Sequence, residues 1–194
     1  QAGALAVLDE TARQYPDSGL TFANRAGIYY DLEKYDEAIK DYSQAIGLGT
    51  NDAVTILNRS TTYFAKGDFE HALEDCKAII RTSPRNAVAY RTCGAAYAAL
   101  GEREQAFEHF DESLRLAPRA GKTFLSRARA YERLGQPDLA LADLGQAAKL
   151  QPELSKDKFF LATRDRAKAT LAAAAAAPAR KSVSAGIERE APGG

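Results

Sequence analysis

The stretch NRAGIYYDLEKYDEAIKDYSQAI, residues 24–46, decides the fold. Its apolar residues recur at the three- and four-residue steps of a helix surface, first around Tyr29 and again around Tyr42. The pattern breaks near Glu33, between the two runs. We therefore predict two short helices joined by a tight turn. The opening of this stretch returns at residues 58–64 as NRSTTYF.

A spacing of 34 residues runs through the chain and marks an internal repeat. Four kinds of residue recur at this spacing. They are Pro84, Pro118 and Pro152; Tyr29, Tyr63, Tyr97 and Tyr131; Ala38, Ala72, Ala106 and Ala140; and Gly67, Gly101 and Gly135. Glu33 stands at the glycine position of the first unit. We predict four units of two helices each, at 19–52, 53–86, 87–120 and 121–154. Small residues at the helix crossings allow the two helices of a unit to approach closely.

The ends of the chain depart from the repeat, as the ends of a repeat array must. Residues 1–18 resemble the second helix of a preceding unit, so they are either a partial repeat or an N-terminal cap. We expect residues 155–177 to form a C-terminal capping helix in which Phe159, Phe160 and Leu161 pack on unit four. The polar, Gly- and Pro-rich residues 178–194 are typical of a disordered tail or linker.

The 34-residue helix-turn-helix unit resembles the tetratricopeptide repeat. That family has an aromatic residue, a small residue and Tyr in the first helix, and Ala, an aromatic residue and Ala in the second. Cys76 and Leu144 replace the second-helix aromatic in units two and four. The resemblance implies an all-α fold, a right-handed superhelix (α-solenoid) whose first helices line a concave groove. It also implies that the groove binds an extended or helical segment of a partner protein.

Charged residues that share one phase of the repeat suggest ion pairs. Three units carry an Arg and, sixteen residues later, an Asp, whereas the third unit has Cys93 and His109 at these places. Pairing each Asp with the Arg of the next unit would leave a charge without a partner at the third unit. We therefore predict pairs within units, which tie the two helices together: Arg25 with Asp41, Arg59 with Asp75, and Arg127 with Asp143.

Other first-helix residues are predicted to line the groove, which would be aromatic and amide-bearing at its N-terminal half and basic at its C-terminal half. They are Asn24, Tyr30, Leu57, Asn58, Thr61, Phe64, Arg91, Lys122, Leu125, Arg129 and Arg133. The two Asn side chains can donate to and accept from a peptide backbone. Tyr30 and Phe64 are candidate anchors, and the arginines could bind an acidic segment or a terminal carboxylate. The alternative is that the aromatics only pack between helices and the arginines are solvated.

One partner class of the family is not favoured. Some members hold a chaperone's C-terminal carboxylates with a Lys/Asn/Lys/Arg clamp across three units, and only Asn58 fits that pattern here. Ala23 and Gly27 stand at the preceding clamp places, and Val88 and Thr92 at the following ones.

Composition and motifs argue against several function classes. The net charge is zero, which favours neither nucleic acid nor an anionic membrane surface. Cys76 and Cys93 form no CxxC and have no His at ligand spacing, so we expect no metal site. Two buried free thiols are the favoured interpretation, with a disulfide as the alternative.

The stretch Gly121, Lys122 and Thr123 looks like the end of a phosphate-binding loop. Leu116 stands where the first Gly of that loop should be, so we interpret the stretch as part of the repeat.

We therefore expect a non-enzymatic protein-interaction module without a cofactor, binding another protein or a peptide segment. One alternative is a structural subunit or assembly factor that contacts partners by its convex face and tail. Another is the regulatory domain of a multidomain enzyme, in a native chain that extends upstream. Self-association stays open. A cytoplasmic location and, if an export signal was removed, a periplasmic one also stay open, since the sequence has no Met.

Overall fold

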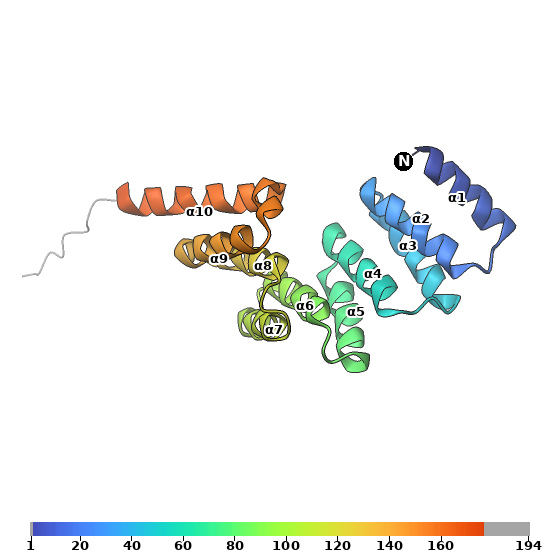
Figure 1. Cartoon of the computed structure of the whole chain (residues 1–194), viewed down its shortest axis with the longest axis horizontal. Helices are drawn as coiled ribbons and strands as arrows, with labels where there is room; N and C mark the ends of the chain where they lie inside the picture. The colour runs from blue at the N-terminus through green and yellow to red at the C-terminus, as the bar shows by residue number, and fades with distance from the viewer. Residues whose placement is uncertain (1, 177–194) are drawn as a thin grey trace, which may run out of the picture.

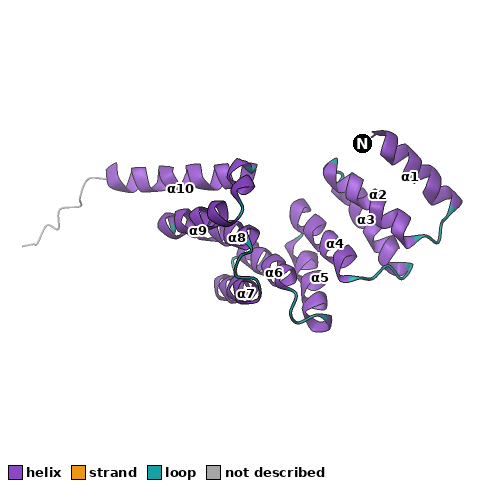
Figure 2. Ribbon diagram, viewed as in Figure 1, coloured by secondary structure: helices purple, strands orange, loops and turns teal. Residues whose placement is uncertain are grey.

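The computed structural model describes residues 2–176, and this part of the chain is all-helical (Figure 2). The elements are α1 (Ala2–Gln14), α2 (Gly19–Asp31), α3 (Tyr35–Gly47), α4 (Ala53–Lys66), α5 (Phe69–Thr82), α6 (Ala87–Leu100), α7 (Arg103–Leu116), α8 (Gly121–Arg133), α9 (Pro137–Leu150), the 3₁₀ helix η1 (Pro152–Lys156) and α10 (Lys158–Ala176). The predicted all-α class is confirmed.

Helices adjacent in the chain pack against each other, so the molecule grows as a stack rather than around one centre (Figure 1). Contacts also join α2 to α4, α4 to α6 and α6 to α8, which places the first helices of successive pairs along one side. At the C-terminal end α10 contacts α8 and α9 and then runs on past them. This is the solenoid architecture that the repeat predicts.

Local sequence explains where the helices begin and end. Side chains of Ser18, Asp52 and Asn86 accept backbone N–H groups at the starts of α2, α4 and α6. Gly67 follows α4 with φ 92°, in the left-handed conformation that suits glycine. Glu33 adopts the same conformation after α2, with φ 58°, so the first turn carries a strain that the glycine turns avoid.

The core is built from small side chains where the two helices of a pair cross. Ala26 and Ala38 are fully buried between α2 and α3. One close crossing is at Gly94 in α6, where an added Cβ would lie 2.9 Å from Cδ1 of Phe110 and 3.0 Å from the carbonyl oxygen of Ala106. Because Phe110 is itself fully buried, it has no free space to move into.

The capping helix begins later than the predicted residue 155. Pro152 opens the 3₁₀ helix, and α10 starts only at Lys158, where the Asp157 carboxylate accepts the N–H groups of Phe159 (2.8 Å) and Phe160 (3.1 Å). Phe160 packs in the core at 6% exposure, as expected, whereas Phe159 stays 45% exposed. The predicted tail, 178–194, lies outside the described residues.

The favoured interpretation of the cysteines was wrong. Cys76 in α5 and Cys93 in α6 form a disulfide, with their Cα atoms 5.6 Å apart. Both residues are fully buried. The repeat places these two side chains on facing helices of adjacent units, a proximity that spacing alone does not reveal.

Candidate functional site

A hollow with a volume of about 660 Å³ runs from α2 across α4, α6 and α8 to α10. Six of the predicted groove residues line it: Tyr30, Thr61, Phe64, Arg91, Arg129 and Arg133. Sequence reasoning missed other lining residues, notably Tyr35, Phe69, Lys158 and Phe159. The first two open second helices, and the last two belong to the capping helix, so a rule that assigns the groove to first helices alone could not find them.

The N-terminal end of the hollow is aromatic. The rings of Tyr30 and Tyr35 lie 5.8 Å apart, and those of Phe64 and Phe69 lie 5.2 Å apart. Each pair joins the first helix of a unit to its second helix, and the two pairs occupy equivalent places in units one and two. The contact accounts for part of their burial, while their remaining surface faces the hollow.

The C-terminal end of the hollow is basic. Arg91, Arg129, Arg133 and Lys158 line it, and within residues 2–176 none of these four cations makes an ion pair. Burial lowers the pKa of both Arg91 and Arg129. The Arg129 guanidinium lies 4.5 Å from the centre of the Phe159 ring, so the exposed aromatic of α10 supports it.

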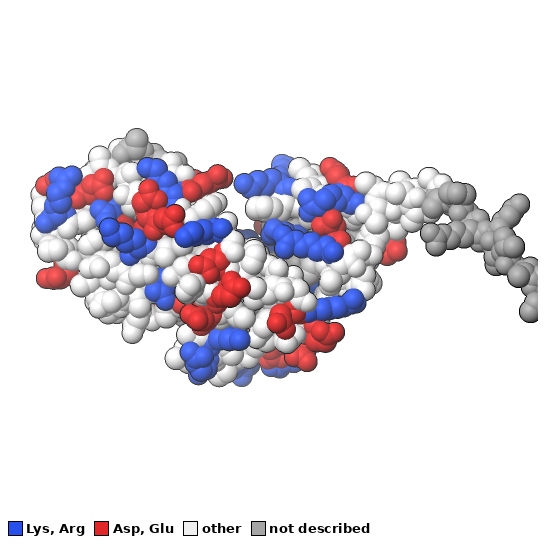
Figure 3. All heavy atoms as spheres, turned by 180° about the vertical axis from the view of Figure 1, so that it is seen from behind, with Lys and Arg blue, Asp and Glu red and all other residues white. Residues whose placement is uncertain are grey.

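Charges of opposite sign therefore mark the two ends of the hollow. Asp31 and Glu33 lie at the aromatic end, where Lys66 is already paired with Asp36 at 2.6 Å. Over much of the face in Figure 3, acidic and basic side chains are mixed, but Lys and Arg gather beside the central indentation, on the side toward α10. A ligand segment that follows the hollow would meet aromatic surface first and unpaired cations second.

The remaining predicted groove residues do not line this hollow. Asn24, Asn58 and Lys122 are exposed on the first helices, and Leu57 is half-buried. The prediction for Leu125 is corrected, because it is only 8% exposed and packs with Leu144 and Phe160 in the core of the last unit. Phe160 of the capping helix belongs to this cluster in unit four, whereas the counterparts Leu57 and Arg91 are only half-buried.

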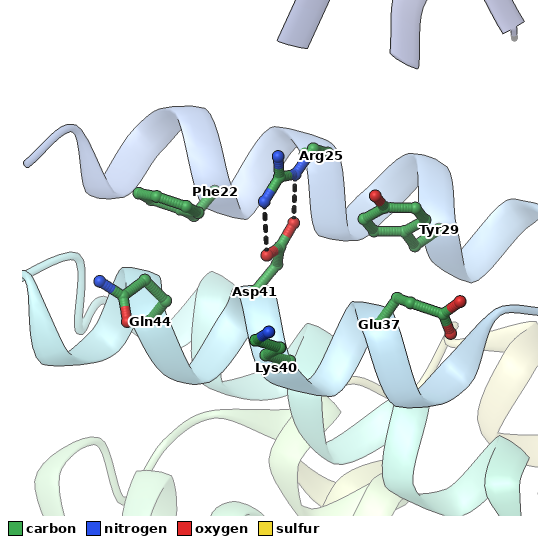
Figure 4. Close-up of a pocket in the computed structure, with 7 residues that line it drawn as sticks. All are labelled: Phe22, Arg25, Tyr29, Glu37, Lys40, Asp41 and Gln44. Atoms are coloured by element: carbon green, nitrogen blue, oxygen red, sulfur yellow. Dashed lines mark hydrogen bonds and ion pairs between the residues drawn. The ribbon is translucent and has the colours of Figure 1, made fainter. Parts of the chain in front are cut away.

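Three Arg–Asp pairs, made of the same residues that the sequence analysis names, link the two helices within a unit. Arg25 donates from Nε to Asp41 at 2.6 Å and from a second nitrogen at 2.9 Å (Figure 4). In Figure 4 the rings of Phe22 and Tyr29 flank the guanidinium along α2, beside a pocket of about 310 Å³. The hydrogen bond with Asp41 raises the pKa of Arg25 above its ordinary value.

The other two pairs have the same two-bond geometry. Arg59 donates to Asp75 at 2.8 and 2.7 Å, and Arg127 donates to Asp143 at 2.8 and 3.0 Å. Each Asp is less than a tenth exposed, whereas each Arg keeps about a fifth of its side chain accessible. Fork-shaped contacts of this kind fix the relative position of two helices more closely than a single bond would.

Each of these arginines also reaches a third helix, which the sequence analysis did not predict. A terminal nitrogen contacts the second helix of the preceding pair: Arg25 with Asp9 at 3.0 Å, Arg59 with Ser43 at 3.1 Å, and Arg127 with Asp111 at 2.7 Å. Asp9, Ser43 and Asp111 share one phase of the 34-residue repeat. The arginines therefore connect neighbouring pairs as well as the two helices of their own pair.

The third unit has none of these three partners. Cys93 stands in the place of Arg, His109 in the place of the paired Asp, and Lys77 in the place of the preceding acceptor. His109 packs against the ring of Tyr97 at 5.0 Å, and Lys77 lies 5.1 Å above the same ring. Aromatic contacts and the disulfide take over where the ion pair is missing.

Within residues 2–176 no group of three or more His, Cys, Asp or Glu side chains could hold a metal ion. None of the helices in that range combines the length and the apolar character that crossing a bilayer requires.

Comparisons with known proteins agree with the repeat. A profile of the tetratricopeptide repeat matches residues 21–48 and 122–154. None of the curated proteins is significantly similar in sequence. One similar solved structure is TTC0263, a thermophilic TPR protein of Thermus thermophilus, with 27% identity over 81% of this chain and 90% of that chain and a TM-score of 0.66. Another is YrrB, a TPR protein described as having an unusual peptide-binding site, with 18% identity over 83% of this chain and 81% of that chain and a TM-score of 0.60. A third is the first TPR of Spaghetti (RPAP3) bound to the HSP90 peptide SRMEEVD, with 26% identity over 60% of this chain and 93% of that chain and a TM-score of 0.55. The 34-residue repeat, the stacked helix pairs and these matches together identify the chain as a tetratricopeptide repeat protein.

Proposed function

We propose that the hollow binds an extended, acidic segment of a partner protein. Tetratricopeptide repeats are protein-interaction modules, so a general role in binding other proteins follows from the repeat itself. The proposal adds where the partner segment lies and what chemistry it has. It also keeps the expectation that the chain is not an enzyme.

The observation that carries the proposal is the unpaired charge. Arg91 and Arg129 are partly buried, face the hollow and have no carboxylate partner among residues 2–176. A partly buried cation costs folding free energy unless a counter-charge offsets it. A carboxylate supplied by a ligand would fill that role, and it would bind more strongly here than at a fully hydrated surface.

The aromatic end supports an extended ligand rather than a small anion. Tyr30 and Phe64 lie on α2 and α4, and the two arginines lie on α6 and α8. Apolar side chains of a partner can pack on the aromatic rings while its acidic side chains meet the arginines. Among the structural relatives, the RPAP3 repeat holds a peptide, SRMEEVD, which also carries several acidic residues. The chain lacks the four-residue clamp, so a partner of that specific class is not proposed.

Panning a random dodecapeptide display library on the immobilised chain tests the proposal. We expect the selected peptides to be enriched in Asp and Glu next to an aromatic or aliphatic residue. The affinity of a selected peptide, measured by fluorescence anisotropy, should fall about tenfold or more in the Arg91→Ala/Arg129→Ala variant. Phe64→Ala should weaken the same peptide by a smaller factor.

The matched control is Arg81→Ala/Arg119→Ala, which removes the same charge from exposed residues outside the hollow. It should leave the affinity nearly unchanged at moderate salt, where distant charges are screened. Both double variants are first compared by circular dichroism to confirm equal helix content. Selection without acidic enrichment, no selected peptide at all, or equal losses in the two variants would each overturn the proposal.

A further inference from the structure

Within residues 2–176, the junctions of α1 with α2, α3 with α4, α5 with α6 and α7 with α8 each have a tie at one repeat position. At three of them the tie is the arginine that reaches back to Asp9, Ser43 or Asp111. At the fourth, Cys93 occupies the arginine position and also reaches back, through its disulfide with Cys76 in α5. The disulfide is therefore the counterpart of the arginine contacts and not an isolated feature.

Besides the disulfide, the Lys77 ammonium of α5 lies over the Tyr97 ring of α6 at this junction. Within residues 2–176, no side-chain hydrogen bond or ion pair joins α5 to α6. Lys77 and His109 stand where acceptors for an arginine would be, so an arginine at position 93 would have no carboxylate to bind. Without the disulfide, this junction would rely on apolar and aromatic contacts alone.

This junction also divides the hollow into its two chemical halves. Tyr30 and Phe64 come from α2 and α4 on one side of it, and Arg91 and Arg129 come from α6 and α8 on the other. Helix α6 carries both Arg91, which lines the hollow, and Cys93, which is fully buried against α5. The position of α6 relative to α5 therefore sets the separation between the aromatic and the basic half.

We propose that the Cys76–Cys93 disulfide is the positioning device of the hollow, holding the aromatic and basic halves at the separation that a partner segment requires. Partner binding at full affinity then needs the oxidised chain. Reduction by a dithiol transfers two electrons and two protons to the cysteines, which become thiols while the dithiol closes to its own disulfide. Loss of the tie lets the two halves move, and an extended ligand must then restore their separation when it binds. The affinity part of this inference rests on the proposed function, whereas the structural part does not.

Hydrogen exchange tests the structural part without a ligand. Treatment with dithiothreitol under unfolding conditions, followed by refolding in the reductant, gives the reduced chain. We expect amide exchange in α5 and α6 to accelerate about tenfold or more relative to the oxidised chain, while α2 and α3 change little. The Cys76→Ala/Cys93→Ala variant should behave like the reduced chain. Equal exchange in the oxidised and reduced chains would overturn the inference.

Peptide affinity tests the functional part, with the acidic dodecapeptide from the display selection as probe. We expect it to bind the reduced chain and the alanine variant about fivefold to tenfold more weakly than the oxidised chain. Dithiothreitol should have no effect on the affinity of the alanine variant. If the oxidised chain binds the peptide and reduction changes nothing, the positioning role is wrong while the proposed function stands. If the oxidised chain selects no peptide, the proposed function fails and the exchange measurement still decides the structural part.

A rescue variant separates positioning from simple loss of stability. Cys93→Arg, His109→Asp and Lys77→Asp together, with Cys76→Ala, rebuild in unit three the arginine contacts of the other units. This chain should bind the peptide within about twofold of the oxidised protein, in the presence or absence of reductant. Failure of a folded rescue variant to bind would show that a tie at this junction is not sufficient, and the inference would be overturned.

Discussion

The junction between units two and three differs from the other junctions in how it resists separation. At the three junctions before α2, α4 and α8, an arginine contacts helices on both sides and holds them with hydrogen bonds that remain partly accessible to water. Between α5 and α6 the tie is covalent and fully buried. One repeat position can thus stabilise the same contact in two ways, and the two respond to different conditions. Hydrogen-bonded arginines respond to loss of their partners, whereas the disulfide responds to reductant.

The largest expected effect comes from removing a carboxylate that pairs with an arginine inside its own unit. Asp75→Ala leaves the Arg59 guanidinium partly buried without its two-bond partner, so we expect the free energy of unfolding to fall by about 2–3 kcal/mol in urea titrations. His109→Ala, at the equivalent place in unit three, strands no charge and should cost less than Asp75→Ala. Equal losses would show that the paired charge of unit two does not distinguish it from unit three as described.

A cycle with Arg59→Ala, Asp75→Ala and the double variant measures the coupling directly. We expect a coupling of about 1–2 kcal/mol. The exposed pair of Arg115 and Glu112, which lies within α7, is the control, and its coupling should be much smaller because water screens it. A coupling for Arg59 and Asp75 no larger than that of the control would rule out a structural role for the buried pair.

An intermediate effect is expected at the helix crossing of unit three. Gly94→Ala places a methyl group against Phe110 and the Ala106 carbonyl, so the unfolding free energy should fall by about 1–2 kcal/mol. Gly145→Ala in α9 adds the same methyl group with no atom within 4 Å and should raise it by about 0.5–1 kcal/mol. Thermal and urea unfolding of the two variants measure both the expected decrease and the expected increase in unfolding free energy. A neutral or stabilising result for Gly94→Ala would show that the crossing of α6 and α7 can adjust to an added methyl group.

The smallest expected effect concerns the acceptor to which each arginine reaches back in the preceding helix pair. Arg59 reaches back to a hydroxyl at Ser43, whereas Arg25 and Arg127 reach back to carboxylates. Ser43→Asp should add a partly exposed ion pair and raise the unfolding free energy by about 0.5 kcal/mol at low salt. The gain should shrink as salt is added, and it should vanish in an Arg59→Ala background. A gain that persists without Arg59 would mean that the new carboxylate acts elsewhere.

Sequence reasoning predicted the repeat and its all-helical fold because tyrosine and alanine mark equivalent places in all four units and proline does so in the last three. Contacts within a unit follow from spacing alone, which is why the composition of the Arg–Asp pairs could be proposed. Contacts between units depend on the rotation that relates one helix pair to the next. The spacing of residues in the sequence gives little information about that rotation. The contacts of Arg25 with Asp9 and of Cys93 with Cys76 therefore became visible only in the structure.

The candidate site was only partly predictable for a related reason. The rule that first helices line the groove found Tyr30, Phe64, Arg91 and Arg129. It also placed Leu125 there, although the capping helix buries that residue. Whether Phe159 or Phe160 faces the core depends on the residue at which α10 starts, and the Asp157 cap decides that. A shift of one residue turns a helix face by about 100°, so small errors in a boundary reverse the assignment.

The three-helix reach of the arginines has a consequence for how the molecule unfolds. In a linear array, stability is a sum of terms for single units and for the interfaces between neighbours. A residue that bonds within its own pair and to the preceding pair belongs to both terms, so opening an interface also weakens the unit beside it. Such shared contacts make unfolding more concerted, whereas at Cys93 the bond crosses only the interface. Once reduced, the chain should therefore separate most easily into two blocks of units, with the boundary between α5 and α6.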